Sequence, residues 1–218
     1  MAIQWESNLS ILPKRPRSFD CQVSLTLKRW FDIMVSAIAL VFLAEIFIII
    51  SLVVRFSSPG PVFYKATRVG RNGKLFKVYK FRSMVDGADK LGPHVTGIDD
   101  PRITHIGRFL RNTKLDELPQ LINVLRGEMS LVGPRPEDPD YVRLYTPEQR
   151  MVLSVRPGIT GAASVIYRHE EALLVGEDRE HRYVQEIMPS KLAIDLEYLR
   201  NISLTRDLKI IANTIISS

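Results

Sequence analysis

Two adjacent carboxylates, Asp116 and Glu117, open an apolar helical pattern in the middle of the chain. One apolar stripe follows at helical spacing and consists of Leu115, Leu118, Leu121, Ile122 and Leu125. Asp116 falls nearly opposite that stripe. Pro119 is tolerated in a first helical turn, so the pattern predicts an outward-facing Asp116 that caps a helix. The positive end of the helix dipole favours ionised carboxylates and bound phosphate at such a place.

A carboxylate pair of this kind can divide the work of phosphate chemistry. One carboxylate can hold Mg²⁺, which bridges to substrate phosphates, and the other can act as a nucleophile or a base. Arginine matches phosphate oxygens in a bidentate way. The cations around the pair are Arg108, Arg111, Lys114, Arg126 and Arg135. Together these groups meet the need of a diphosphate substrate for charge neutralisation. The spacing alone, however, favours a simpler interpretation, a capping aspartate beside solvated arginines.

Two further segments place an arginine beside a tight turn. They are GPRP (133–136) and RPGITG (156–161). Gly and Pro fix the backbone there, and exposed amides could meet a phosphate. Taken alone, each segment is better explained by ordinary turn chemistry.

The elements that position these residues are predicted to be mainly helical. Asn72-Gly73 is typical of a hairpin turn between two β-prone runs. Residues 85–104, rich in Asp and Gly, indicate a loop. No alternating strand–helix pattern occurs, so the predicted fold class is mainly α with a small β-hairpin (α+β). The helices are expected at about 105–113, 116–127, 147–154, 180–200 and 205–216.

A long apolar segment runs from Trp30 to Val54, with Asp32 and Glu45 as its charges. At about 1.5 Å per residue, one helix of this length crosses a bilayer. Both flanks are basic, which marks cytoplasmic sides, and a segment that re-enters on the same side satisfies both. Glu45 would be costly at the bilayer centre and also favours shallow insertion. A buried helix of a soluble protein is the alternative.

This segment divides the chain into three parts. We expect a polar basic arm at 1–27, a membrane-embedded helix at 28–56 and a cytoplasmic catalytic domain at 57–218. The net charge of +6 indicates an anionic partner, whether nucleic acid, lipid or a phosphorylated substrate. Few aromatics are free for base stacking, so we expect no nucleic-acid partner. The single cysteine, Cys21, excludes an internal disulfide framework.

Four motifs follow one another in the chain: SPGPVFY, KVYKFRSM, LDELPQLINVLRGEMSLVGPRP and VRPGITG. In this order they resemble the bacterial sugar transferase family, the monotopic polyprenyl-phosphate phosphoglycosyl transferases. The resemblance extends from about residue 27 to 216.

The resemblance implies an enzyme that transfers a sugar 1-phosphate from a UDP-sugar to undecaprenyl phosphate and releases UMP. This is the first membrane step of exopolysaccharide, capsule, O-antigen or glycoprotein glycan synthesis. The implied location is the bacterial inner membrane, with membrane lipid as a partner and the catalytic domain on the cytoplasmic face. The oligomeric state is left open, with a homo-oligomer as one alternative. The remaining alternative is a non-enzymatic basic scaffold at the membrane surface, for which Asp116 and Glu117 would be dispensable.

Site residues follow from the same resemblance. Asp116 matches the nucleophile that carries a covalent phosphosugar, and Glu117 matches its Mg²⁺-binding partner. Arg111 is implied to meet a substrate phosphate. Further basic positions implied to line the site are Lys80, Arg135 and Arg156. Asp195 and Asp207 match acidic positions that we interpret as structural.

The sequence departs from the family pattern in two places. Relatives commonly carry Ser-Pro midway in the apolar segment, where this chain has Ala44-Glu45, so a bend there lacks its usual cause. After RPGITG the family often continues LAQVNGR, whereas this chain has AASVIYRHEEALL. We expect this second region to contribute to the donor site.

Overall fold

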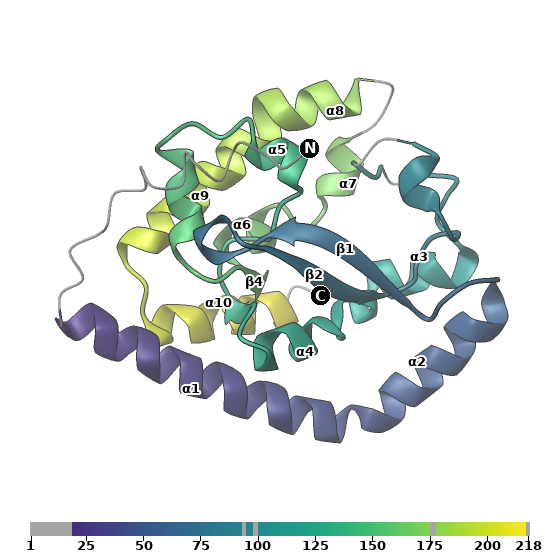
Figure 1. The fold of residues 1–218 in the computed structure, drawn as a ribbon, viewed down its shortest axis with the longest axis horizontal. Coiled ribbons are helices and arrows are strands. Elements are labelled where there is room, and N and C mark those ends of the chain that lie inside the picture. The colour runs from purple at the N-terminus through teal and green to yellow at the C-terminus, as the bar shows by residue number, and fades with distance from the viewer. Residues whose placement is uncertain (1–18, 93–94, 98–99, 175–177, 217–218) are drawn as a thin grey trace.

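A computed structural model describes residues 19–92, 95–97, 100–174 and 178–216. Most of the predicted arm lies outside these residues, and so does the side chain of Cys21. The described part is mainly helical with two small sheets, and two long helices run along one edge of it (Figure 1). The predicted fold class, mainly α with a β-hairpin, is confirmed.

The two edge helices are α1 (Phe19–Phe42) and α2 (Ala44–Ser57). They meet at Leu43, whose φ of −93° and ψ of 3° interrupt the helix, and their axes are bent by 64°. A single helix from Trp30 to Val54 is therefore wrong. Within the described residues no one helix has the length and hydropathy to cross a membrane; the bent pair does by length and composition, as a broken or a re-entrant segment.

The bend follows from what each helix packs against. In α1, Asp32 is 2 % exposed and accepts hydrogen bonds from Ser130 Oγ (2.7 Å) and the Leu131 amide (3.2 Å). In α2, Ile50 and Val54 are buried in a different cluster. Because each helix buries one face against a different part of the fold, the chain can bend between them without a proline.

The opposite faces of both helices expose large apolar side chains. These are Trp30, Met34, Ile38, Val41, Phe42, Ile48, Ile49, Leu52 and Phe56. An exposed apolar surface of this extent marks an interaction face. The fold therefore leaves an exposed apolar edge along α1 and α2.

The predicted hairpin is present. β1 (Phe63–Val69) pairs antiparallel with β2 (Leu75–Phe81), and Asn72 takes a φ of 56° in the turn. Lys80 stands opposite Tyr64 near the open end of the hairpin.

A second sheet was not predicted. β3 (Ser130–Val132) lies parallel to β4 (Gly158–Thr160) and brings the GPRP and RPGITG segments together. The Gly133 amide donates to Thr160 O and the Gly158 amide donates to Pro134 O, both at 2.9 Å. A Cβ on Gly158 would lie 2.2 Å from the Gly133 nitrogen, so only glycine permits this approach. The amides of Gly133 and Gly158 are therefore not free to meet a phosphate, because each pairs with a carbonyl of the other segment.

The other helices surround these sheets. Their bounds are α3 (His105–Asn112), α4 (Gln120–Leu125), α5 (Pro139–Val142), α6 (Ala162–Ile166), α7 (Glu170–Leu173), α8 (Arg179–Arg182), α9 (Met188–Arg200) and α10 (Leu204–Ile216). A π-helical segment, Tyr183–Ile187, joins α8 to α9, so 180–200 is helical as predicted. The stretch 147–154 is a 3₁₀ helix, Gln149–Ser154.

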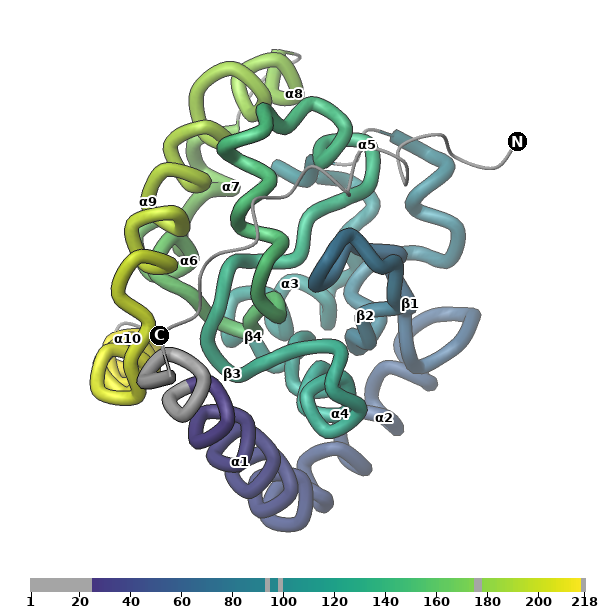
Figure 2. Tube along the Cα trace, turned by 60° about the vertical axis from the view of Figure 1, so that its left-hand side comes forward, coloured from purple at the N-terminus to yellow at the C-terminus, as the bar shows by residue number. Residues whose placement is uncertain are grey.

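The C-terminal helix α10 lies beside the start of α1 (Figure 2). Lys28 of α1 pairs with Asp207, and Tyr198 donates to the same carboxylate at 2.6 Å. The Ala163 amide donates to Asp195 at 3.4 Å. Both aspartates thus join elements of the fold, in keeping with the structural interpretation.

Candidate active site

The carboxylate pair sits in a tighter turn than predicted. Lys114 takes a left-handed φ of 56°, and Leu115–Glu117 then form a 3₁₀ turn before α4 begins at Gln120. Asp116 is therefore not the cap of a helix over 116–127. It is 4 % exposed and lines a cleft, so the expected outward placement is also wrong.

Glu117 is held by two cations from separate segments. Lys80 Nζ of β2 donates to Glu117 Oε1 at 2.8 Å, and Arg135 Nη2 donates to the same oxygen at 2.6 Å. Arg135 Nη1 reaches Oε2 at 3.4 Å. Burial alone would raise the pKa of Glu117, but Arg135 and Lys80 outweigh it and hold that pKa well below its usual range. Glu117 is therefore a firmly ionised carboxylate.

Burial and Glu117 act on the two cations in opposite ways. Desolvation lowers the pKa of Lys80, and Glu117 only partly offsets this. The charge of Glu117 raises the pKa of Arg135. Arg135 thus stays charged at any working pH, whereas Lys80 is the group that burial makes more acidic.

Asp116 has the opposite environment from its neighbour. Among the residues that the structure describes, no donor makes a hydrogen bond to its carboxylate. Burial raises the pKa of Asp116, and Lys80 opposes that rise. We expected nearby cations to favour its ionised form, and Lys80, Arg111 and Lys114 do lower the pKa, although burial outweighs them. A poorly solvated, unpaired carboxylate retains its lone pairs for bond formation.

The structure brings most of the predicted site residues to one cleft of about 1190 Å³. They come from β2, α3, the 3₁₀ turn and the loop after β3. The predicted residues that line it are Lys80, Arg111, Asp116, Glu117 and Arg135. Pockets of such a size accommodate ligands as large as a nucleotide sugar.

Arg111 has a partner that was not expected, and Arg156 lies elsewhere. The Arg111 guanidinium forms an ion pair with Glu171 of α7, a partner that no sequence pattern indicated. Arg156 is not brought to the cleft. Its Nε donates to the Gly127 carbonyl just beyond α4 at 2.8 Å, and burial together with Arg29 lowers its pKa. In this structure Arg156 thus makes a structural contact with the end of α4.

One positioning residue was missed. Asn123, fully buried in α4, accepts from the Tyr79 amide (3.0 Å) and donates to Lys77 O (2.7 Å). These bonds fix α4 against β2 and so fix Glu117 relative to Lys80. A polar residue inside the apolar run of a helix was the pattern that could have indicated it.

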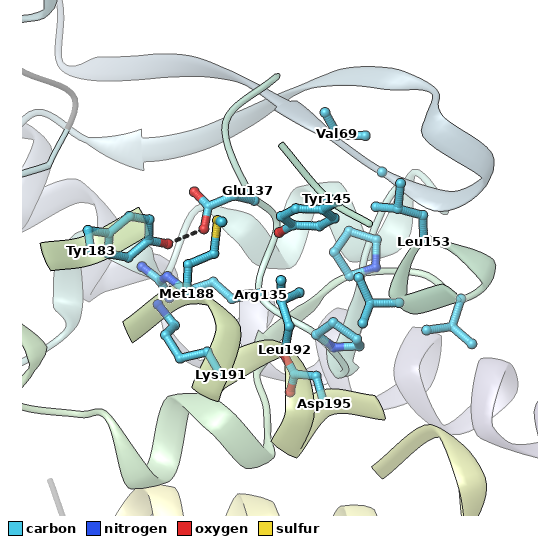
Figure 3. Close-up of a pocket in the computed structure, with 15 residues that line it drawn as sticks. Val69, Arg135, Glu137, Tyr145, Leu153, Tyr183, Met188, Lys191, Leu192 and Asp195 are labelled. Atoms are coloured by element: carbon cyan, nitrogen blue, oxygen red, sulfur yellow. Dashed lines mark hydrogen bonds between the residues drawn. The ribbon is translucent and has the colours of Figure 1, made fainter. Parts of the chain in front are cut away.

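Arg135 also lines a second, small cavity of about 30 Å³ (Figure 3). Tyr183 donates a hydrogen bond to Glu137, and Tyr145 and side chains of α9 are among the other residues that line the cavity. Burial raises the pKa of Tyr183, and the neighbouring Glu137 adds to this effect. The Tyr183 hydroxyl is thus a fixed donor that orients the segment carrying Arg135.

The donor set suits a hard cation that is shared with a substrate. No group of three or more His, Cys, Asp or Glu that could hold a metal occurs in the described part of the chain. Mg²⁺, however, needs only one or two carboxylates when phosphates and waters complete its shell. Glu117 Oε2 accepts a single long hydrogen bond, so it keeps a lone pair for such an ion.

Comparison with known proteins agrees with this arrangement. The chain is 42 % identical over 203 residues to the exopolysaccharide production protein PSS of Rhizobium leguminosarum bv. phaseoli, covering 89 % of this chain and 96 % of that protein. It is 36 % identical to the exopolysaccharide production protein ExoY of Sinorhizobium fredii, covering 86 % and 83 %. It is also 42 % identical to the UDP-glucose:undecaprenyl-phosphate glucose-1-phosphate transferase of Escherichia coli, covering 88 % of this chain and 40 % of that one.

A family description covers nearly the whole chain as well. Residues 23–218 match the family described as bacterial sugar transferase. This match overturns the alternative of a non-enzymatic scaffold. The chain therefore belongs to the bacterial sugar transferase family and is an enzyme, a phosphoglycosyl transferase.

Proposed function

We propose that this enzyme transfers a sugar 1-phosphate from a UDP-sugar to undecaprenyl phosphate and releases UMP. The observation that carries the proposal is the contrast between an unpaired buried Asp116 and an adjacent Glu117 clamped by Lys80 and Arg135. The names of the relatives support the donor class, the acceptor and a place in exopolysaccharide synthesis.

The proposed reaction has two balanced steps. Asp116 attacks the sugar-side phosphorus of the donor, the bond from that phosphorus to the bridging oxygen breaks, and UMP leaves with the electron pair. An oxygen of undecaprenyl phosphate then attacks the same phosphorus and displaces the Asp116 carboxylate. The products are a lipid diphosphate sugar and free enzyme. Both acceptor and nucleophile are anions, so neither step needs a general base.

The surrounding charges explain how two anions can approach each other. Lys80 and Arg135 lie beside Glu117 and would hold the diphosphate oxygens, with Arg111 farther along the cleft. Glu117 would hold Mg²⁺, which supplies Lewis-acid neutralisation of the leaving phosphate when bound. Ground-state repulsion between Asp116 and the donor is thereby reduced.

The covalent step is tested by isotope exchange. With lipid-stripped enzyme, labelled UMP should exchange into the UDP-sugar without any polyprenyl phosphate, and Asp116→Asn should abolish the exchange. Asp178→Asn, a substitution of the same kind at an exposed position, should retain it. If stripped enzyme shows no exchange with its correct donor, yet turns over once lipid is added, a ternary-complex mechanism replaces the covalent one.

The exposed apolar edge of α1 and α2 supports membrane attachment. We infer that residues 28–56 enter and leave the inner membrane on its cytoplasmic side, and that residues 57–218 form the cytoplasmic catalytic domain. Cys21, the only thiol, precedes this segment and serves as a probe. In intact spheroplasts it should resist a membrane-impermeant maleimide and react after lysis. Labelling before lysis, absent in a Cys21→Ser control, would mean that the segment crosses the membrane.

A further inference from the structure

Arg111, the cation of α3 that lines the cleft, is paired with a carboxylate 60 residues away. Its Nη2 donates to Glu171 of α7. The Nε of the same guanidinium is buried and has no hydrogen-bond partner within the described part of the chain. A buried donor without a partner is costly. The guanidinium therefore has one donor satisfied by a carboxylate and another that awaits an acceptor.

The next carboxylate on α7 has a different role. Glu170 pairs with Lys191 of α9 at 2.5 Å, and the Lys191 ammonium lies 5.3 Å from the centre of the Tyr183 ring. The Glu170 side chain is 22 % exposed, whereas that of Glu171 is 36 % exposed. Glu170 thus anchors α7 to α9, and the Glu171 side chain can leave Arg111 by rotation alone.

We propose that Glu171 occupies, in the ligand-free enzyme, the place of a donor phosphate oxygen at Arg111, and so sets the affinity for the nucleoside diphosphate. Carboxylate and phosphate compete for the same guanidinium fork. Phosphate has more oxygens and can also satisfy Nε, so exchange gains a hydrogen bond. Binding must first displace Glu171. The apparent affinity is therefore the intrinsic affinity multiplied by the fraction of molecules in which Arg111 is free of Glu171. The inference rests on the proposed function of this cleft.

A double-mutant cycle with UDP and Mg²⁺ as probe tests the proposal. Binding to the full chain in lipid nanodiscs is measured by calorimetry for the wild type, Glu171→Gln, Arg111→Gln and the double variant. Glu171→Gln should tighten UDP binding about fivefold, as loss of a partly exposed ion pair permits. Arg111→Gln should weaken it. In the Arg111→Gln background, Glu171→Gln should give no gain.

The control is Glu186→Gln, which removes the same charge from an exposed ion pair with Arg182. It should leave UDP binding unchanged. In steady state, Glu171→Gln should lower KM for the donor and leave kcat within about twofold, because the substitution changes binding and not chemistry.

Three outcomes would overturn the inference. Unchanged or weaker UDP binding by Glu171→Gln would make Glu171 a residue that holds Arg111 in place. An equal gain in the Arg111→Gln background would indicate a general charge effect. Absence of UDP binding to the wild type, together with absence of UMP release, would instead refute the proposed function, and the inference would fall with it.

Discussion

Glu117 and Glu171 each pair with an arginine in the same cleft, but their surroundings differ. The Glu117 side chain is 12 % exposed and accepts from both Lys80 and Arg135. The Glu171 side chain is 36 % exposed and, within the described residues, pairs with Arg111 alone. At the Glu117 end, burial and paired cations fix the charges before a substrate arrives. At the Arg111 end the pairing is open to solvent, which weakens it.

This difference suggests a division between chemistry and binding. Fixed dipoles and charges lower a reaction barrier because they need no reorganisation during the reaction. Loosely held charges can instead be exchanged for those of a ligand. The predictions below test whether the Glu117 end carries the chemistry and the Arg111 end carries the affinity.

The largest effect is expected at Glu117. Glu117→Gln keeps the shape but removes the charge that Lys80 and Arg135 neutralise, and it removes the proposed Mg²⁺ ligand. UMP release should fall by about 10²–10³-fold, as when one electrostatic group of an active site is deleted. Glu148→Gln, at an exposed position, should keep full activity. Undiminished activity of Glu117→Gln, or of wild type in excess EDTA, would contradict this prediction.

The second prediction concerns the pH dependence set by Lys80. Burial raises the pKa of Asp116, and Lys80 is the main group that opposes the rise. Removing that cation should raise the pKa further, so the carboxylate will be protonated, and inactive as a nucleophile, at higher pH. In Lys80→Met the acid limb of kcat/KM should shift upward. A shift of one pH unit costs about tenfold in activity below the limb.

Lys74→Met is the control for this experiment, because Lys74 is exposed in the hairpin turn. It should leave the pH profile in place. An acid limb that stays where it is in Lys80→Met, even with reduced kcat, would show that Lys80 acts on the substrate and not on Asp116.

The Glu117 end of the cleft could be predicted from the sequence better than the Arg111 end. The motif around Asp116 and Glu117 predicted the carboxylate pair with Arg135 near it, and the resemblance added Lys80. The pairing of Arg111 with Glu171 was not predictable, because it joins two elements across a tertiary contact with no local pattern. Arg156 was misplaced because a nearby helix end offered its guanidinium a carbonyl acceptor, Gly127 O.

The fold shows the same limit. The hairpin at Asn72-Gly73 and the helices near 105–113 and 205–216 were predicted because turn residues and apolar spacing are local features. The parallel pairing of β3 and β4 escaped detection because each strand has three residues and the partners lie far apart in sequence. The helix at 116–127 was predicted too early, since the left-handed Lys114 imposes a 3₁₀ turn first.

The smallest effect is expected at Asp195, which lines the same small cavity as Arg135. Burial raises the pKa of Asp195 from 3.8 to about 7. Between these values the folded state binds more protons than the unfolded state, so this group destabilises the fold increasingly as pH rises through about 7. Asp195→Asn keeps an acceptor for the Ala163 amide without the charge. Its Tm should exceed that of the wild type by about 2–4 °C at pH 8, the shift that about 1 kcal/mol gives in a chain of this size. Near pH 4 the two melting temperatures should converge.

Scanning calorimetry at both pH values decides the matter, and a gain of equal size at pH 4 would assign the stabilisation to packing. UMP release by Asp195→Asn should equal that of the wild type, because the clamp on Glu117 depends on Arg135 and Lys80 and not on the ionisation of Asp195.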